Sequence, residues 1–258
     1  MTVDLQFKEV TKQRDQFMLK ISGMTVEKGE ILGVIGNNGA GKSTMIQLVL
    51  RLIQPSSGEI YRYRDGELVL SLQDWKRDVG FVFDDLSVYD DLHLTKLAAF
   101  LSEVYPDWDD SHFFSLLDKF EVDVKKKIKK FSRGMRMKAG IAAALAHHPK
   151  LLLLDEPTSG LDTKSRKQMI ALLQKEHENN GTTIIFSSHI LSDMEQLATS
   201  IWLMDKGEIL LHGAVEDLQA NHTVAEDGTI HKEVSSTRGM RRATLEELHD
   251  YYLGGDIE

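Results

Sequence analysis

Gly36-Asn37-Asn38-Gly39-Ala40-Gly41-Lys42-Ser43 is the stretch that decides the fold of this 258-residue sequence. It matches the pattern G-x-x-x-x-G-K-[ST] in full, and it lies between a short apolar run at 31–35 and a helical pattern that starts at Lys42. Glycines allow several backbone N–H groups to turn inward around an anion, and the N-terminus of the following helix adds its positive dipole end. We therefore expect residues 36–44, with Thr44 as the last, to bind the phosphates of a nucleotide. Lys42 is expected to reach the β and γ phosphates, and the Ser43 hydroxyl to ligate Mg²⁺.

The alternative interpretation of this stretch is a glycine-rich turn with an incidental lysine. For average composition, a chance match in a chain of this length is expected about once in a hundred sequences. The strand before the loop and the helix after it lower that expectation further, so phosphate binding is favoured.

Composition sets limits on the rest of the chain. Apolar residues make up 41% and charged residues 28%, which is typical of a globular protein. Lys and Arg number 31 against 40 Asp and Glu, and the resulting net charge of −9 argues against nucleic acid as a partner. Cysteine is absent from the sequence, which excludes disulfides, thiolate metal sites and cysteine nucleophiles. No apolar run approaches the ~18 residues of a spanning helix, so we expect that the chain does not cross a membrane by itself.

Strand and helix signals alternate along the chain, which predicts an α/β fold with a mostly parallel sheet covered on both faces. An antiparallel hairpin is expected where two short apolar runs flank Lys206-Gly207. The predicted strands are 31–35, 59–63, 67–70, 79–83, 151–154, 182–187, 201–203 and 208–212, with 223–236 extended. The predicted helices are 42–53, 92–105, 109–120, 132–147, 163–180, 190–198 and 214–220, and a last helix that a capping box at Thr244 starts and that runs to about 253.

We interpret residues 1–258 as a single domain. Its α/β core comprises 1–85 and 148–213, a helical insert comprises 86–147, and a C-terminal extension comprises 214–258.

Two carboxylates follow the apolar run Leu151–Leu154, at Asp155 and Glu156. A strand that ends in Asp beside a phosphate loop is able to hold Mg²⁺, usually through water. We expect Asp155 to serve the metal and Glu156 to polarise an attacking water. The alternative, a buried strand whose end carries solvated acids, loses weight because the phosphate loop is present in the same chain.

Three further motifs occur in order: Phe131-Ser132-Arg133-Gly134-Met135 before a helix, Ser159-Gly160-Leu161-Asp162 after the acid pair, and Ser187-Ser188-His189 at a strand end. With the phosphate loop, they resemble the ATP-binding subunit of an ABC (ATP-binding cassette) transporter over residues 1–213. The resemblance implies a P-loop NTPase core and a head-to-tail dimer. In such a dimer ATP lies between the phosphate loop of one subunit and the signature motif of the other, which implies nucleotide contacts for Ser132, Gly134 and Asp162 and a γ-phosphate sensor at His189.

The signature motif and the magnesium loop depart from the family pattern. The family signature is usually Leu-Ser-Gly-Gly-Gln, and Arg133 and Met135 differ from it here. Arg133 either adds charge near a phosphate or faces solvent. Where the family has a glutamine that touches Mg²⁺, this chain has Asp84, which is either a metal ligand or an acid at a helix start.

Base recognition and the basic run are two further departures. The family has an aromatic residue before the phosphate loop that stacks on adenine. Its only aromatic counterpart here is Phe17, which lies slightly late in the pattern, and Arg14 is the other candidate to stack on the base. The basic run Lys125–Lys130 is interpreted as a solvated face, with contact to anionic lipid headgroups as the alternative.

The resemblance implies that ATP hydrolysis drives a separately encoded membrane permease at the cytoplasmic face. The second ATP-binding subunit would be either a copy of this chain or a different one. The C-terminal pattern Arg242–Leu248 resembles exporter subunits of bacteria, including those for antibiotics and antimicrobial peptides, which favours export of a small molecule, antibiotic or peptide.

Two other functions compete with transport. One is a soluble ABC ATPase that acts on ribosomes or DNA, but those relatives carry two cassettes or a long coiled-coil insertion, and this chain has one phosphate loop and an acidic balance. The other is a module that binds ATP without hydrolysing it. The intact set of Lys42, Asp155, Glu156 and His189 argues against that.

Overall fold

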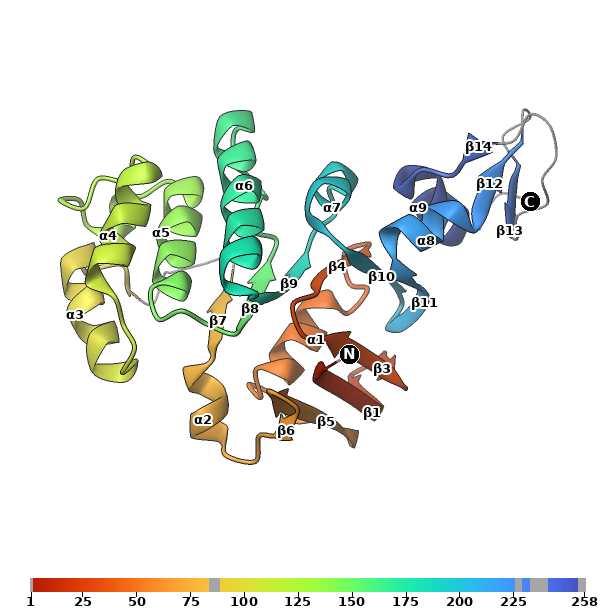
Figure 1. The fold of residues 1–258 in the computed structure, drawn as a ribbon, viewed down its shortest axis with the longest axis horizontal. Coiled ribbons are helices and arrows are strands. Elements are labelled where there is room, and N and C mark those ends of the chain that lie inside the picture. The colour runs from red at the N-terminus through yellow and green to blue at the C-terminus, as the bar shows by residue number, and fades with distance from the viewer. Residues whose placement is uncertain (1, 84–88, 226–228, 233–240, 255–258) are drawn as a thin grey trace. The chain divides into compact units, whose positions relative to one another are not determined.

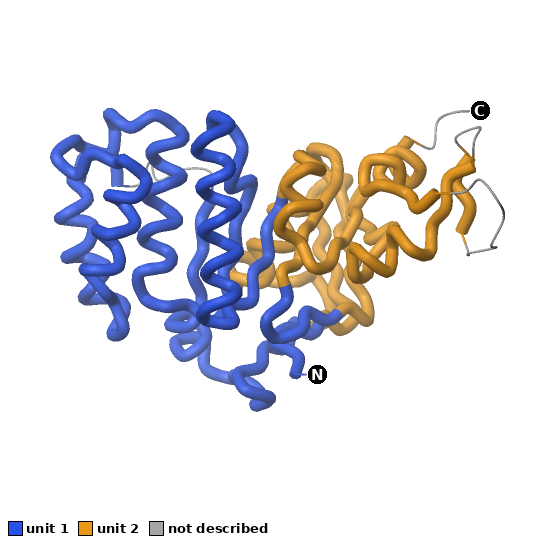
Figure 2. The backbone as a smooth tube through the Cα atoms, turned by 45° about the horizontal axis from the view of Figure 1, so that its top comes forward, with its two compact units in different colours: residues 1–6, 25–30, 60–187 blue, residues 7–24, 31–59, 188–258 orange. Residues whose placement is uncertain are grey.

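The computed structural model describes residues 2–83, 89–225, 229–232 and 241–254. They form two compact units that interleave along the sequence (Figure 2). The first unit contains residues 1–6, 25–30 and 60–187, and the second contains 7–24, 31–59 and 188–258. Strands β1 (Val3–Arg14), β3 (Met24–Glu27) and β5 (Ser57–Arg64) each begin in one unit and end in the other.

The first unit contains a parallel sheet of β7 (Val79–Val82), β8 (Leu151–Asp155) and β9 (Thr183–Ser187). The four leucines of β8 are at most 2% exposed. Such a continuous apolar run suits a parallel strand that is covered on both faces, whereas a half-solvated strand would alternate. The parallel sheet that the sequence predicts is therefore confirmed.

Helices of the first unit include the predicted helical insert, drawn in yellow to green in Figure 1. Its three helices are α3 (Leu94–Val104), α4 (Asp110–Lys119) and α5 (Arg133–Leu145). They pack in series, α3 on α4 and α4 on α5, and α5 packs on β7. The remaining elements of this unit are β6 (Glu67–Leu68), which pairs with β5, α2 (Leu72–Arg77), a 3₁₀ turn at Ile128–Lys130, and α6 (Thr163–Asn180).

Helix α2 lies in a stretch for which the sequence pattern predicts no helix. Ser71 caps its start by accepting a hydrogen bond from the backbone N–H of Asp74, and Trp75 anchors it at 5% exposure. Six residues span less than two turns, so the apolar periodicity that reveals longer helices has no room to appear.

The second unit contains the strand order β4 (Ile31–Gly36), β10 (Ser200–Asp205), β11 (Glu208–Ala214). Strand β4 runs parallel to β10, and β10 pairs with β11 as the antiparallel hairpin that the sequence predicts. A second hairpin joins the end of β1 to β2 (Phe17–Ile21). Helices α1 (Lys42–Val49) and α7 (Leu191–Leu197) pack against β4, all of whose residues are buried.

Helix α1 ends four residues before the predicted end at residue 53. Arg51 adopts a left-handed conformation with φ of 53°. Its backbone N–H donates to the carbonyl of Leu48, and that of Leu52 donates to the carbonyl of Gln47. This is a Schellman motif, which normally uses Gly or Asn at the left-handed position. Because Arg51 occupies that position, the sequence gives no sign that the helix ends there.

In the C-terminal part of the second unit, the described residues form two helices and three short strands. They are α8 (Val215–Ala220), β12 (His222–Val224), β13 (Ile230–Lys232), β14 (Arg241–Arg242) and α9 (Leu245–Leu253). Strand β12 pairs with both β13 and β14. Buried His222 joins this part internally, because its ring nitrogens contact the Leu218 carbonyl at 2.8 Å and the Tyr252 hydroxyl at 3.1 Å.

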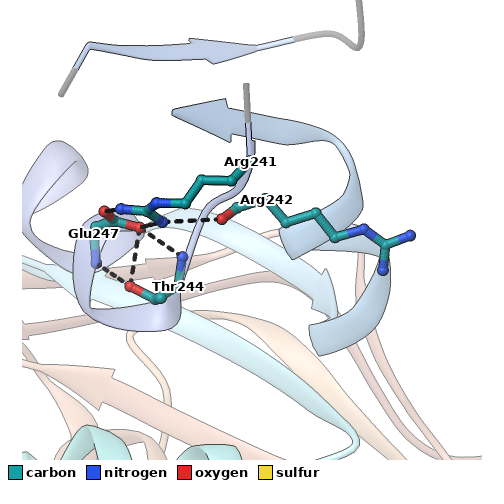
Figure 3. A network of polar contacts seen from close by, with 4 residues as sticks. All are labelled: Arg241, Arg242, Thr244 and Glu247. Atoms are coloured by element: carbon teal, nitrogen blue, oxygen red, sulfur yellow. Dashed lines mark hydrogen bonds and ion pairs between the residues drawn. The ribbon is translucent and has the colours of Figure 1, made fainter. Parts of the chain in front are cut away.

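The start of α9 is fixed by a polar network around Glu247 (Figure 3). The backbone N–H of Thr244 donates to Glu247 Oε2 at 2.9 Å, and that of Glu247 donates to Thr244 Oγ1 at 3.2 Å, which confirms the predicted capping box. The Arg241 guanidinium donates to both carboxylate oxygens of Glu247. The hydrogen bonds from Arg241, with those from Thr244, lower the pKa of Glu247 to about 2.

We predict that Glu247→Gln loosens α9 in a pH-dependent way. The folded state lowers the pKa of Glu247 from 4.5 to about 2, so its stabilising effect is complete above pH 4.5 and disappears as the pH falls towards 2. At pH 7 the substitution is expected to cost about 0.5 kcal/mol of local stability, the usual size of an exposed ion pair, because glutamine keeps the capping box and loses only the charge that faces Arg241. Hydrogen exchange of the amides of residues 245–253, corrected for intrinsic rates, measures this, and wild type and variant should converge near pH 2.

Glu246→Gln is the matched control. Glu246 lies in the same first turn of α9 and is exposed. Its replacement by glutamine removes one negative charge near the helix N-terminus, as Glu247→Gln does. An equal loss of protection in both variants would show that the helix dipole, and not the network with Arg241, holds the start of α9.

Candidate functional site

The phosphate loop, residues 36–43, joins the end of β4 to the start of α1 within the second unit. Gly41 stands at the helix N-cap with φ of 112°, and a Cβ there would lie 3.0 Å from both Leu19 Cδ1 and Phe17 Cζ. A Cβ on Gly36 would lie 2.3 Å from the Met204 carbonyl oxygen. The two glycines of the motif are therefore required by backbone conformation and by close approach, as the pattern predicts.

Lys42 is the buried cation of this loop, with 6% of its surface exposed. Its ammonium donates to the carbonyl oxygens of Gly36 at 2.7 Å and Asn37 at 3.3 Å. A buried charge needs such partners, and backbone dipoles satisfy it without neutralising it. The ammonium is thus held inside the loop by two backbone carbonyls, a position that fits the binding of an anionic phosphate chain.

The other loop residues offer backbone and hydroxyl groups at the surface. Asn37, Asn38 and Gly39 are exposed, and the N–H of Ala40 closes the turn on the Asn37 carbonyl at 3.1 Å. Ser43 is exposed in the first turn of α1, and its neighbour Thr44 is buried.

Both candidates for base recognition lie beside the phosphate loop, on the hairpin of β1 and β2. Arg14 and Phe17 face each other in the register of that hairpin. The Arg14 guanidinium donates to Gln47 Oε1 on α1 at 2.8 Å, and the Phe17 ring approaches the backbone of Gly41. Both side chains therefore remain candidates to contact a base.

The acid pair is positioned by Ser187 within the first unit. Asp155 ends β8 and pairs in register with Ser187 at the end of β9. The Ser187 hydroxyl donates to Asp155 Oδ1 at 2.6 Å and accepts from the backbone N–H of Glu156 at 3.0 Å. One buried hydroxyl thus fixes the side chain of the first acid and the backbone of the second. In the sequence, Ser187 is recognisable only as part of the histidine motif, because this role depends on the pairing of β8 with β9.

Glu156 has a left-handed backbone with φ of 52°. This conformation is unfavourable for a residue with a Cβ, and it is found mostly where the surroundings enforce it, often at functional sites. Both Asp155 and Glu156 are half-buried.

The signature residues and Asp162 stand at two helix starts of the first unit. Ser132 caps α5 by accepting a hydrogen bond from the N–H of Met135 at 3.2 Å. Asp162 caps α6, where it accepts from the N–H of Ser165 at 3.0 Å and from its hydroxyl at 2.6 Å. These bonds lower the pKa of Asp162, so the carboxylate is ionised at neutral pH. Gly134 allows α5 to approach this turn, since a Cβ there would lie 3.1 Å from Leu161 Cδ2.

His189 belongs to the second unit, where it precedes α7 and is exposed. Its neighbour Ser188 is fixed on both sides, because its N–H donates to the Val34 carbonyl at 3.2 Å and its hydroxyl accepts from the N–H of Ile190 at 3.0 Å. Asp84, the predicted additional metal ligand, lies outside the described residues.

The described residues contain no cluster of three or more His, Asp or Glu side chains that would hold a metal ion. Mg²⁺ in nucleotide sites is usually held by one or two protein oxygens together with phosphates and waters. The oxygen donors of Ser43 and Asp155 suit that kind of binding by their chemistry. Over the same described ranges, no helix combines the length and the apolar character that a membrane span requires.

Comparison with known proteins identifies the family of this chain. The ABC transporter family matches residues 19–159. The ABC transporter ATP-binding protein NatA of Bacillus subtilis (strain 168) is 34% identical over 209 residues, which are 76% of this chain and 81% of NatA. The bacitracin transport ATP-binding protein BcrA of Bacillus licheniformis is 34% identical over 238 residues, 90% of this chain and 76% of BcrA.

A solved structure agrees with these sequence relatives. The dimeric post-hydrolysis state of the ATP-binding cassette MJ0796, bound to ADP and Pi, is similar with a TM-score of 0.70 and 26% identity, over 81% of this chain and 98% of that one. The P-loop NTPase fold that the sequence predicts is confirmed, as is the predicted family. The chain belongs to the ABC transporter family, as an ATP-binding subunit that hydrolyses ATP.

Proposed function

We propose that this chain hydrolyses ATP to drive export of a small molecule, antibiotic or peptide through a separately encoded membrane permease. The observation that carries the proposal is a complete phosphate loop with a buried Lys42, in a chain whose relatives include a bacitracin transport ATP-binding protein. In this proposal the chain is peripheral to the cytoplasmic face of the membrane and is held there by the permease.

The phosphate loop supplies binding and charge. The backbone amides of residues 36–44 and the Lys42 ammonium hold the β and γ phosphates, where positive charge offsets the negative charge of the transferring group. Ser43 and Asp155 are the residues that would hold Mg²⁺, which supplies further neutralisation of phosphate charge when bound.

The groups that act on the attacking water and the γ-phosphate come from strand ends. Glu156 accepts a hydrogen bond from the water and orients it towards phosphorus, as a carboxylate with a fixed backbone can. His189 donates a hydrogen bond to the γ-phosphate. Loss of that phosphate after hydrolysis removes the contact, so the state of the nucleotide is sensed at this position.

A second ATP-binding subunit completes the site in this proposal. Ser132, Gly134 and Asp162 contact the nucleotide that the partner's phosphate loop holds. Two copies of this chain or two different subunits both satisfy this arrangement. Because ATP contacts both subunits, its binding favours the closed dimer and its hydrolysis releases it. The dimeric relative bound to ADP and Pi supports this proposal.

The first prediction for this function concerns Lys42→Ala. Removing the ammonium takes a charge-assisted hydrogen bond from the phosphates, so ATP affinity should fall about tenfold or more. Calorimetric titration with ATP measures this. Lys206→Ala, which removes an exposed lysine of the same unit, is the control and should bind ATP as wild type does. Unchanged affinity in Lys42→Ala would refute the assignment of the loop.

The second prediction concerns Glu156→Gln, which keeps the shape of the side chain and removes its charge. Turnover should fall about 100-fold or more, the usual effect of removing a general base, while ATP binding is retained. Gel filtration with ATP should then show a dimer, because the closed state is no longer released by hydrolysis. Turnover near the wild-type rate would exclude Glu156 as the group that orients the water.

A third prediction separates transport from action on ribosomes or DNA. Purified from its source under mild detergent, the chain should bring down a multi-spanning membrane protein. Co-purification with ribosomal RNA in place of a membrane protein would contradict the transport proposal and favour the alternative.

A further inference from the structure

The side chain of Arg133 lies across the backbone of Gly160, and both residues belong to the first unit. A Cβ placed on Gly160 would lie 3.3 Å from Arg133 Cδ and 3.7 Å from its Nε and Nη1. Gly160 also has φ of 72°, a conformation that favours glycine. Because Gly160 has no side chain, the side chain of Arg133 has room to lie over the turn.

A second close approach joins the same two segments. A Cβ on Gly134, the next residue of α5, would lie only 3.1 Å from Leu161 Cδ2. Arg133 and Gly134, at the start of α5, thus meet Gly160 and Leu161 one after the other. Two neighbouring contacts restrain both sliding and rotation of the turn relative to α5 better than either contact alone.

The turn that α5 contacts begins at Glu156. The Ser159 N–H donates to the Glu156 carbonyl at 3.1 Å, and the Leu161 N–H donates to the Thr158 carbonyl at 3.2 Å. Thr158 is 4% exposed, and Asp162 ends the turn as the cap of α6. Glu156 itself has an unfavourable left-handed backbone, which persists only where neighbouring structure holds it.

We propose that Arg133 is a positioning residue, which holds the turn 156–162 by packing the aliphatic part of its side chain on Gly160 and so fixes Glu156 for catalysis. The inference rests on the proposed function, in which Glu156 orients the attacking water. It gives the arginine of the altered signature motif a role within its own subunit. A direct bond from its guanidinium to phosphate is the competing role.

Steady-state ATP hydrolysis by the full chain, over a range of Mg²⁺–ATP concentrations, separates the two roles. Arg133→Ala removes the contact with Gly160, whereas Arg133→Met keeps a long unbranched side chain and removes the charge. Arg133→Ala should lower kcat about tenfold, because small displacements of a catalytic group are costly, with KM for ATP within about twofold of wild type. Arg133→Met should restore kcat to within about threefold of wild type.

Two controls make the result specific. Lys130→Ala removes an exposed positive charge two residues before Ser132 and should leave kcat and KM unchanged. In a Glu156→Gln background, Arg133→Ala should lower the residual turnover no further, because its effect passes through Glu156.

Several outcomes would overturn the inference. A wild-type kcat in Arg133→Ala would show that the contact has no catalytic consequence. If Arg133→Met fails as Arg133→Ala does, and KM rises in both, the guanidinium charge acts on phosphate. If Arg133→Ala lowers residual turnover in the Glu156→Gln background as well, it does not act through Glu156. Failure of the wild-type chain to hydrolyse ATP would instead refute the proposed function, so the two failures are distinguishable.

Discussion

The buried ammonium of Lys42 imposes the constraint on which the phosphate loop depends. A charge with 6% exposure must be satisfied, and here the carbonyls of Gly36 and Asn37 turn back towards it. That turn is possible only if the backbone passes Met204 without a Cβ at 36 and enters α1 through the positive φ of Gly41. The backbone conformation that satisfies the lysine also leads directly into the start of α1, where helix N–H groups favour an anion. The same residues thus meet the requirements of the local fold and of anion binding, which explains why so short a motif predicts both.

The acid pair in the first unit is also fixed by one polar group, which is the Ser187 hydroxyl where the phosphate loop has the Lys42 ammonium. Ser187 donates to Asp155 and accepts from the N–H of Glu156, so two residues of one strand end are fixed by a single side chain of the next strand. Because β8 and β9 are parallel and in register at this pair, the two strand ends coincide. The order of the carboxylates then divides their roles: the first is tied into the sheet, and the second begins the turn towards α6.

Local signals allowed most of this fold to be predicted from the sequence, and the failures have identifiable causes. Helix α6 coincides with its predicted range because Asp162 caps it and Gly181 ends it in a left-handed conformation. Helix α1 ends earlier than predicted because Arg51 adopts the left-handed conformation that glycine usually adopts at a helix end. An arginine at that position is no sequence signal for the end of a helix. The role of Ser187 depends on a strand register between positions 32 residues apart, which no single-chain pattern specifies. Asp84 lies outside the described residues, so its proposed metal role stays a prediction.

The arginine of the altered signature motif lies beside a glycine of another segment. An arginine in place of glycine at 133 brings a long side chain to the start of α5, and Gly160 leaves the space that this side chain crosses. Ser132 and Gly134 match the family signature, and in this chain the serine caps α5 and the glycine allows close approach to Leu161. In the proposed function, residues 132 and 134 contact the nucleotide of the partner subunit. In our inference, residue 133 holds the turn that carries Glu156 within its own subunit. A comparison with the family pattern detects the change at 133, but only the position of Gly160 indicates which neighbour accommodates it.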